Sequence, residues 1–168
     1  MKISWLRIPG RLKALKQLRT PGDCWLLARA LVIAALVPVL FRFRLSTISR
    51  WLERRTRHVS RVSDAAGIES IIRCVELAMI LGRPLVRPKC LTRTITLYYF
   101  LRPTGLNLSV CFGATLKNGQ LEPVPGHCWL LKDGLPFLEA DDPAGRFIPI
   151  YTLPNPLCRN VSAAPASC

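Results

Sequence analysis

The sequence predicts a single α+β domain in which helices precede a small antiparallel sheet. The chain has 168 residues, half of them apolar, so it can bury an ordinary core without disulfide bonds. Up to Leu101 the apolar residues recur at helical spacing, and from Leu106 they alternate with polar residues as in a half-buried strand. Asn-Gly and Asp-Gly pairs, which favour hairpin turns, follow in the alternating part. Helices followed by a sheet are typical of the α+β class.

Charge divides the chain into two unequal parts. Residues 1–62 carry 14 Lys and Arg against Asp23 and Glu53, whereas the remainder carries 10 basic and 8 acidic residues. A strongly basic region suits an acidic peptide, an anionic membrane surface or nucleic acid, and charge alone does not choose among them. We expect residues 1–62 to form a basic helical N-terminal region, followed by a core at 63–153 and a loose tail at 154–168.

The seven cysteines form no recognisable framework. Their number is odd, no pair has Cys-x-x-Cys spacing, and the sequence has no secretory signal of the usual form. This pattern favours reduced thiols in a cytoplasmic protein and argues against a disulfide framework or a structural zinc site. We therefore expect neither metal nor cofactor, and we expect most of the thiols to be small buried hydrophobic groups.

The longest apolar stretch, residues 24–41, is predicted to be a helix. Arg29 is its one charge and Pro38 its one breaker, and its longest uncharged part has twelve residues. That length is more typical of a buried or interfacial helix than of a membrane span. Arg29 would also cost about 2.5–3.5 kcal/mol at the centre of a bilayer. We expect a core helix, with membrane contact left open.

Shorter basic helices are predicted on both sides of this stretch. Leu12, Leu15 and Leu18 recur at helical spacing among Lys and Arg, which fits either a solvated surface helix or an anchor on a membrane or partner. Residues 45–57 can form a second such helix. His58 follows among arginines that disfavour its charged form, so we expect it to face solvent.

Two helices with clear boundaries come next. Asp64 is a good N-cap for a helix that stops at Gly82, and its buried face consists of Ile68, Ile71, Ile72, Val75 and Met79. After Pro88, a leucine-rich and aromatic helix begins near Cys90 and ends before Gly105. A thiol at a helix start feels the positive end of the helix dipole, which favours the nucleophilic thiolate.

Three strands are predicted after this helix. Residues 106–112 alternate between apolar and polar side chains, and Asn118-Gly119 marks a turn. Residues 127–131 form the second strand, Asp133-Gly134 a tight turn, and residues 136–139 the third strand. The helix that carries Cys90 therefore leads into an antiparallel sheet.

Cys90, His127 and Glu139 can form a catalytic triad. A thiolate nucleophile needs an imidazole at hydrogen-bonding distance, and the imidazole needs an acceptor on its other nitrogen. His127 opens one strand of a predicted hairpin and Glu139 closes the next, so their side chains can be neighbours on one sheet face. Asp141 and Asp142 are alternatives for the third role.

Three motifs in one order indicate a family. They are Lys-Cys-Leu-x-Arg from Lys89, Gly-His-Cys-Trp-Leu from Gly126 and Asp-Gly-x-Pro from Asp133. This order resembles the transglutaminase-like branch of the papain-type cysteine proteases, and more narrowly the B-protein family of lasso-peptide biosynthesis. The resemblance covers roughly residues 64–153, and more loosely the apolar helix before them. In that family the enzyme cuts the leader from a ribosomally made precursor and passes the core peptide to an ATP-using cyclase.

The resemblance implies a papain-like core with Cys90 as nucleophile, His127 as base and Glu139 where the family usually has Asp. Some members of that family carry a winged-helix leader-recognition domain before the protease. Residues 1–62 show no strand pattern that could supply one, so the resemblance implies a separate recognition protein. The expected partners are the precursor leader, that recognition protein and the cyclase, with possible membrane-surface contact and no nucleic acid. The expected location is the cytoplasm, either free or associated with the membrane.

Two alternatives to a leader peptidase remain at this stage. The thioester could pass its acyl group to an amine instead of water, as transglutaminases do. The chain could also be a non-catalytic membrane-associated adaptor on a degenerate protease fold. In every case we expect Arg93 and Trp129 to support or pack around the site rather than react. Zinc binding by Cys90 and His127 is a more remote alternative.

Overall fold

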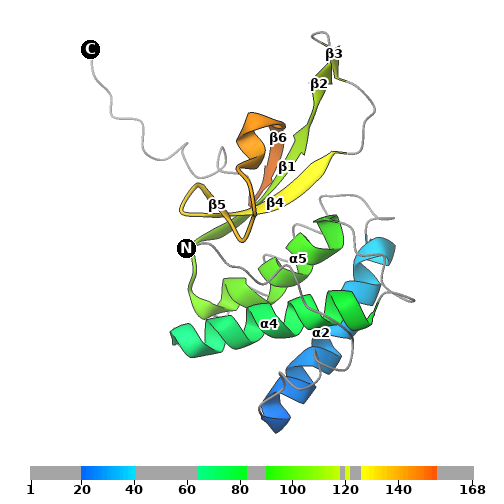
Figure 1. Ribbon diagram of the computed structural model, residues 1–168, viewed down its shortest axis with the longest axis vertical. Helices are drawn as coiled ribbons and strands as arrows, with labels where there is room; N and C mark the ends of the chain where they lie inside the picture. The colour runs from blue at the N-terminus through cyan, green and yellow to red at the C-terminus, as the bar shows by residue number, and fades with distance from the viewer. Residues whose placement is uncertain (1–19, 41–63, 83–89, 118–119, 122–125, 155–168) are drawn as a thin grey trace.

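A computed structural model describes residues 20–40, 64–82, 90–117, 120–121 and 126–154 of the chain. These residues form three α-helices, a four-stranded antiparallel sheet and a separate two-stranded ribbon (Figure 1). The predicted α+β class is thereby confirmed. Four predictions lie outside the described residues: the helix that carries Leu12, Leu15 and Leu18, the helix at residues 45–57, the exposure of His58, and all but the first residue of the tail.

Helix α2 (Pro21–Leu40) begins three residues before the predicted start, because a capping box fixes its N-terminus. The Thr20 N–H donates to the Asp23 carboxylate at 3.1 Å, and the Asp23 N–H donates to the Thr20 hydroxyl at 3.2 Å. Asp23 is buried and also accepts a hydrogen bond from Ser70, with Arg73 at 3.8 Å. The cap therefore ties the start of α2 to the neighbouring helix α4.

Helix α4 (Ala65–Leu81) matches its predicted boundaries. The Asp64 carboxylate accepts the Gly67 N–H at 2.9 Å, and the Gly82 N–H donates to the Ala78 carbonyl at 2.9 Å. These two contacts close both ends of the helix. Helix α4 packs against α2 on one side and α5 on the other.

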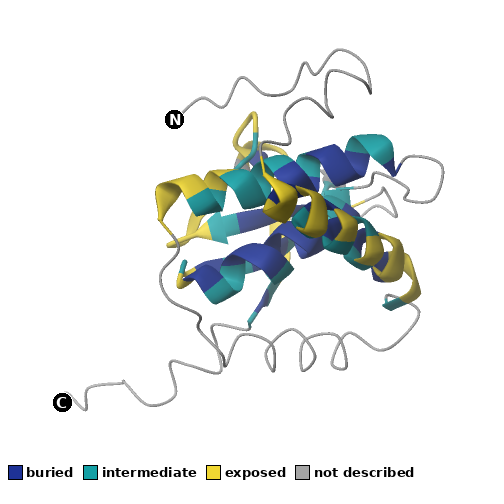
Figure 2. Cartoon of the chain, turned by 90° about the horizontal axis from the view of Figure 1, so that it is seen from below, coloured by how far each residue is buried: buried dark blue, intermediate teal, exposed yellow. Residues whose placement is uncertain are grey.

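Helix α5 (Cys90–Leu101) is the central element of the fold, and it begins at Cys90 as predicted. Eight of its twelve residues are buried. It packs against α2 and α4 and, on its other side, against strands β1 and β4, so it separates the helical layer from the sheet (Figure 1). A short 3₁₀ helix, η1 (Arg102–Thr104), follows, and Gly105 ends it with a φ of 89°. Figure 2 shows the buried residues gathered between the two layers.

The sheet has the strand order β5-β4-β1-β6, and all neighbouring strands are antiparallel. Its strands are β1 (Leu108–Ala114), β4 (His127–Lys132), β5 (Leu135–Phe137) and β6 (Ile148–Leu153). Strands β2 (Leu116–Lys117) and β3 (Gln120–Leu121) form the ribbon. Strand β6 was not predicted.

The turn between β4 and β5 has the predicted Asp-Gly chemistry. Asp133 and Gly134 both have positive φ, 51° and 83°, as a two-residue hairpin turn of type I′ requires. This turn confirms the predicted hairpin. The predicted Asn118-Gly119 turn lies between β2 and β3, outside the described residues.

Buried thiols predict how stability depends on pH. Burial raises the pKa of Cys111 to about 11, and raises the pKa values of Cys74 and Cys128 above the ordinary value of 9.0. Above pH 9 these thiols ionise in the unfolded chain but stay protonated in the folded one. Burial of the neutral thiols therefore contributes fully to stability below pH 9. This contribution is lost as the pH rises through the pKa values of the thiols in the folded state.

We expect the free energy of unfolding, measured with urea, to fall between pH 9 and pH 11. Each thiol contributes a slope of at most about 1.4 kcal/mol per pH unit. Lysines and tyrosines titrate in the same range, so the informative comparison is with Cys111→Ala. That variant should lose stability less steeply with pH than the parent chain. Identical slopes for the two proteins would contradict the assignment to Cys111.

Candidate active site

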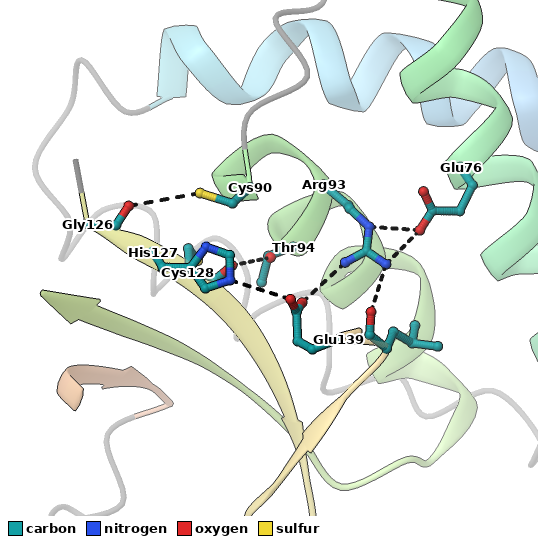
Figure 3. Close-up of polar contacts among 9 residues, drawn as sticks. Glu76, Cys90, Arg93, Thr94, Gly126, His127, Cys128 and Glu139 are labelled. Atoms are coloured by element: carbon teal, nitrogen blue, oxygen red, sulfur yellow. Dashed lines mark hydrogen bonds and ion pairs between the residues drawn. The ribbon is translucent and has the colours of Figure 1, made fainter. Parts of the chain in front are cut away.

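The Cys90 thiol lies against the start of strand β4. Cys90 is the first residue of α5 and is partly exposed. Its Sγ lies 4.0 Å from the carbonyl oxygen of Gly126, the residue immediately before His127 (Figure 3). The first N–H groups of a helix have no partner within the helix, so those at the start of α5 take no part in its own hydrogen bonds. The structure thus brings Cys90 to the segment that carries His127.

His127 contacts Glu139 through one ring nitrogen. Its Nε2 lies 3.4 Å from the Glu139 Oε2, and both side chains are largely shielded from solvent, with 27% and 16% exposed. Nδ1 is then the ring nitrogen left for a second partner. Figure 3 shows the imidazole lying between the Cys90 thiol and the Glu139 carboxylate. Asp141 and Asp142, the other candidates for the orienting role, are exposed.

Glu139 reaches His127 by a route different from the predicted one. Strand β5 pairs with β4 in a register that, continued by two residues, would set Glu139 opposite Cys128. Neighbouring strand residues point to opposite faces, so that arrangement would turn Glu139 away from His127. Instead β5 has already ended, and Leu138 has a φ of 62° that takes the chain out of the ladder. The predicted third strand is therefore present at Pro136 and Phe137 but wrong in extending to Glu139, although the predicted His127–Glu139 pair forms.

Arg93 holds the Glu139 carboxylate in place. Its Nη1 lies 3.3 Å from Glu139 Oε1, and its Nη2 donates to the Leu138 carbonyl at 3.0 Å. Its Nε donates to Glu76 on α4 at 2.8 Å (Figure 3). The guanidinium is thus fixed between two carboxylates, as its planar fork of donors allows. Arg93 has the supporting role that was expected, whereas Glu76 was not identified from the sequence.

Two aromatic rings set the plane of the imidazole. The His127 ring stacks on Trp129, with centroids 5.7 Å apart, and on Phe147, with centroids 5.0 Å apart. Trp129 is the expected packing residue. Phe147 precedes β6 and lies twenty residues from His127 in the sequence, so no local pattern pointed to it.

Two glycines make room for this cluster. A Cβ on Gly113, which pairs with His127 in the sheet, would lie 2.7 Å from the Trp129 ring. A Cβ on Gly126 would lie 2.7 Å from the Gly113 carbonyl oxygen. Real Cβ atoms do not approach backbone or ring atoms so closely, so any side chain at these positions would displace the start of β4 or the Trp129 ring.

Cys128 lies next to His127 in sequence but has a different environment. Its side chain is buried, and burial is the largest cause that raises the pKa of its thiol, followed by the proximity of Cys90. A thiol that stays protonated is a poor nucleophile. Cys90 is therefore the better candidate. Within the described part of the chain, no group of three His, Cys, Asp or Glu side chains is arranged to hold a metal ion.

Comparison with known proteins identifies a family. A family model described as Transglut_core3, the transglutaminase-like superfamily, matches residues 27–152. No curated protein and no solved structure matches the chain. The matched range spans most of the sequence, from within α2 to within β6, and it includes the Cys90 helix and the strand that begins with His127. The chain belongs to the transglutaminase-like superfamily, which includes cysteine peptidases and acyltransferases.

Proposed function

We propose that this chain is a cysteine peptidase that removes the leader from a ribosomally made lasso-peptide precursor. The observation that carries the proposal is the order of contacts at the site. The Cys90 thiol lies beside the carbonyl that precedes His127, and the Nε2 of His127 contacts Glu139. A thiol, an imidazole and a carboxylate in this order are the parts that nucleophilic acyl chemistry requires.

In this proposal the Cys90 thiolate attacks the carbonyl carbon of the scissile peptide bond. N–H groups at the start of α5 hold the negative oxygen that forms. The C–N bond then breaks, imidazolium at His127 gives its proton to the leaving amine, and the acyl group remains on Sγ as a thioester. Water next attacks the thioester while His127 accepts its proton, the C–S bond breaks, the acid is released, and the Cys90 thiolate is regenerated beside imidazolium at His127. Glu139 orients the imidazole and stabilises its charged form.

The substrate class rests on three motifs in order. Lys-Cys-Leu-x-Arg, Gly-His-Cys-Trp-Leu and Asp-Gly-x-Pro resemble the lasso B-protein family, and each supplies part of the arrangement. They contain Cys90 with Arg93, His127 with Trp129, and the turn that leads to Glu139. We propose further that a separate small protein delivers the leader and that the cyclase receives the core peptide, in the cytoplasm or at the membrane surface.

The proposal predicts that Cys90→Ala and His127→Ala abolish cleavage. Each removes a group that forms or breaks a bond, so we expect kcat/KM to fall by at least about a thousandfold. The substrate is a lasso-peptide precursor, incubated with a leader-recognition protein, both sought among the genes that neighbour the gene for this chain, and mass spectrometry measures the released leader and core. Cys24→Ala, which removes an exposed thiol outside the site, is the matched control and should cleave normally.

The products distinguish the alternatives. Free leader and core peptides indicate hydrolysis, whereas a leader acyl group attached to an added amine indicates acyl transfer. Normal cleavage by Cys90→Ala or His127→Ala would overturn the triad. A chain that binds the precursor but releases no product in either form would instead fit the non-catalytic adaptor.

Glu139 offers a test of the orienting group. Glu139→Gln keeps the shape of the side chain but removes the charge that faces His127, so we expect kcat to fall about 10²–10⁴-fold with little change in KM. Asp141→Asn removes a nearby exposed carboxylate and should leave kcat unchanged. The reverse result, with Asp141→Asn inactive and Glu139→Gln active, would assign the orienting role to Asp141.

Arg93→Met tests the support of Glu139. The variant keeps much of the side-chain bulk but leaves the Glu76 and Glu139 carboxylates without the guanidinium between them. We expect it to lower the free energy of unfolding by about 1–2 kcal/mol, because the contacts are only partly shielded from solvent. We also expect kcat to fall more than tenfold, with a partial recovery in Arg93→Lys. An Arg93→Met variant with unchanged kcat would show that Glu139 needs no support.

A further inference from the structure

The outer face of helix α2 is apolar and exposed. Its inner face is fully buried against the other helices through Ala30, Ala34 and Val37. The opposite side carries large hydrophobic side chains that are 45–68% exposed, namely Trp25, Val32, Leu36 and Val39. Figure 2 shows exposed positions recurring along this helix beside the buried ones. The expectation of a core helix therefore holds for one side of α2 only.

A surface helix of a soluble protein normally turns a charged side toward water. Helix α2 contains two charged residues, and only Arg29 lies on the outer face, beside Trp25 and Val32. Asp23 is buried against α4, and the Arg29 guanidinium lies 5.6 Å from the centre of the Phe100 ring. The outer face therefore exposes apolar surface along the length of the helix, which is a marker of an interaction site.

This face is also hollowed. Trp25, Arg29, Val32 and Tyr99 line the hollow together with Ala28 and Ile33, and its surface is almost wholly apolar. Arg29 is the one cationic residue in its lining. An apolar hollow that also contains a guanidinium matches the chemistry of a lipid, which has an acyl chain next to an anionic phosphate.

We propose that the outer face of α2 lies on an anionic membrane surface. The sequence on both sides of the helix is strongly basic, since residues 1–62 carry 14 Lys and Arg against two acidic residues, one of them the buried Asp23. Apolar side chains on one face of a helix, together with nearby positive charge, are the requirements for binding at the interface of an anionic bilayer.

The helix lies on the membrane rather than crossing it. By length and composition α2 could span a bilayer, as the core helices of soluble proteins also could. Its buried side, however, packs against α4 and α5, whereas an isolated spanning helix would expose that side to lipid. In Figure 1 the sheet and α2 lie on opposite sides of α5, so contact through α2 leaves the sheet side of the Cys90 site open to a peptide. The inference does not depend on the proposed peptidase activity.

The test is co-sedimentation of the full chain with phosphatidylcholine vesicles that contain or lack phosphatidylglycerol. We expect binding to the anionic vesicles and little binding to the neutral ones. The double variant Val32→Gln/Leu36→Gln should weaken that binding about a hundredfold, because two apolar side chains no longer enter the interface. The matched control is Leu135→Gln/Ile150→Gln, which changes two exposed apolar residues on the sheet and should bind as the parent does.

Each other outcome overturns the proposal. Equal weakening by both double variants would mean that general surface hydrophobicity is responsible. Binding that survives Val32→Gln/Leu36→Gln but disappears in high salt would mean that the basic segments bind without α2. A parent chain that ignores vesicles but forms dimers in sedimentation velocity, with the α2 variant monomeric, would assign the face to a second copy. Circular dichroism of all the variants establishes that they fold.

Discussion

The arrangement of the site depends on the contact between the first turn of α5 and strand β4. The Thr94 hydroxyl donates to the Cys128 carbonyl at 2.9 Å, and this hydrogen bond is buried. Cys90 lies four residues before Thr94 and three before Arg93, so its side chain is a neighbour of both on the helix surface. One helical turn therefore brings the thiol to Gly126, the residue before His127, and fixes the strand that carries His127. The same turn supplies the cation that holds Glu139.

This contact leaves little freedom in the neighbouring sheet. Gly113 leaves room for the Trp129 ring, and Gly126 allows the start of β4 to lie close to the Gly113 carbonyl. The imidazole is then confined by Trp129 and Phe147 and by its contact with Glu139. A ring held on three sides is preoriented, which reduces the entropy that must be lost when a substrate is positioned for reaction.

Local patterns in the sequence were sufficient to predict the helix and the turn that carry the site residues, but not most of the contacts that hold those residues in position. The start of α5 at Cys90 and the turn at Asp133-Gly134 follow from helix and hairpin chemistry, which a few adjacent residues determine. Glu139 contacts His127 only because Leu138, which lies outside any strand, has a left-handed backbone conformation. Phe147 and Glu76 come from parts of the chain that are distant in sequence from the residues they contact. Such contacts arise from tertiary packing, and no periodicity in one sequence records them. The start of α2 at Pro21 was not predicted for a different reason, since Pro-Gly usually marks a break between elements, whereas proline also favours the first position of a helix.

Polar contacts also connect the N-terminal helix to the site through α4. Asp23 at the start of α2 meets Ser70 and Arg73 on α4, and Glu76, one turn further along α4, meets Arg93. Helix α2 belongs to the strongly basic part of the sequence, residues 1–62, yet it packs into the same hydrophobic core as α4 and α5. Its inner face therefore helps to hold the α4 residue that orients Arg93, while its outer face remains available. A surface that binds a membrane can in this way be part of the same rigid body as the Cys90 site, so docking would fix the orientation of the site relative to the bilayer without changing its geometry.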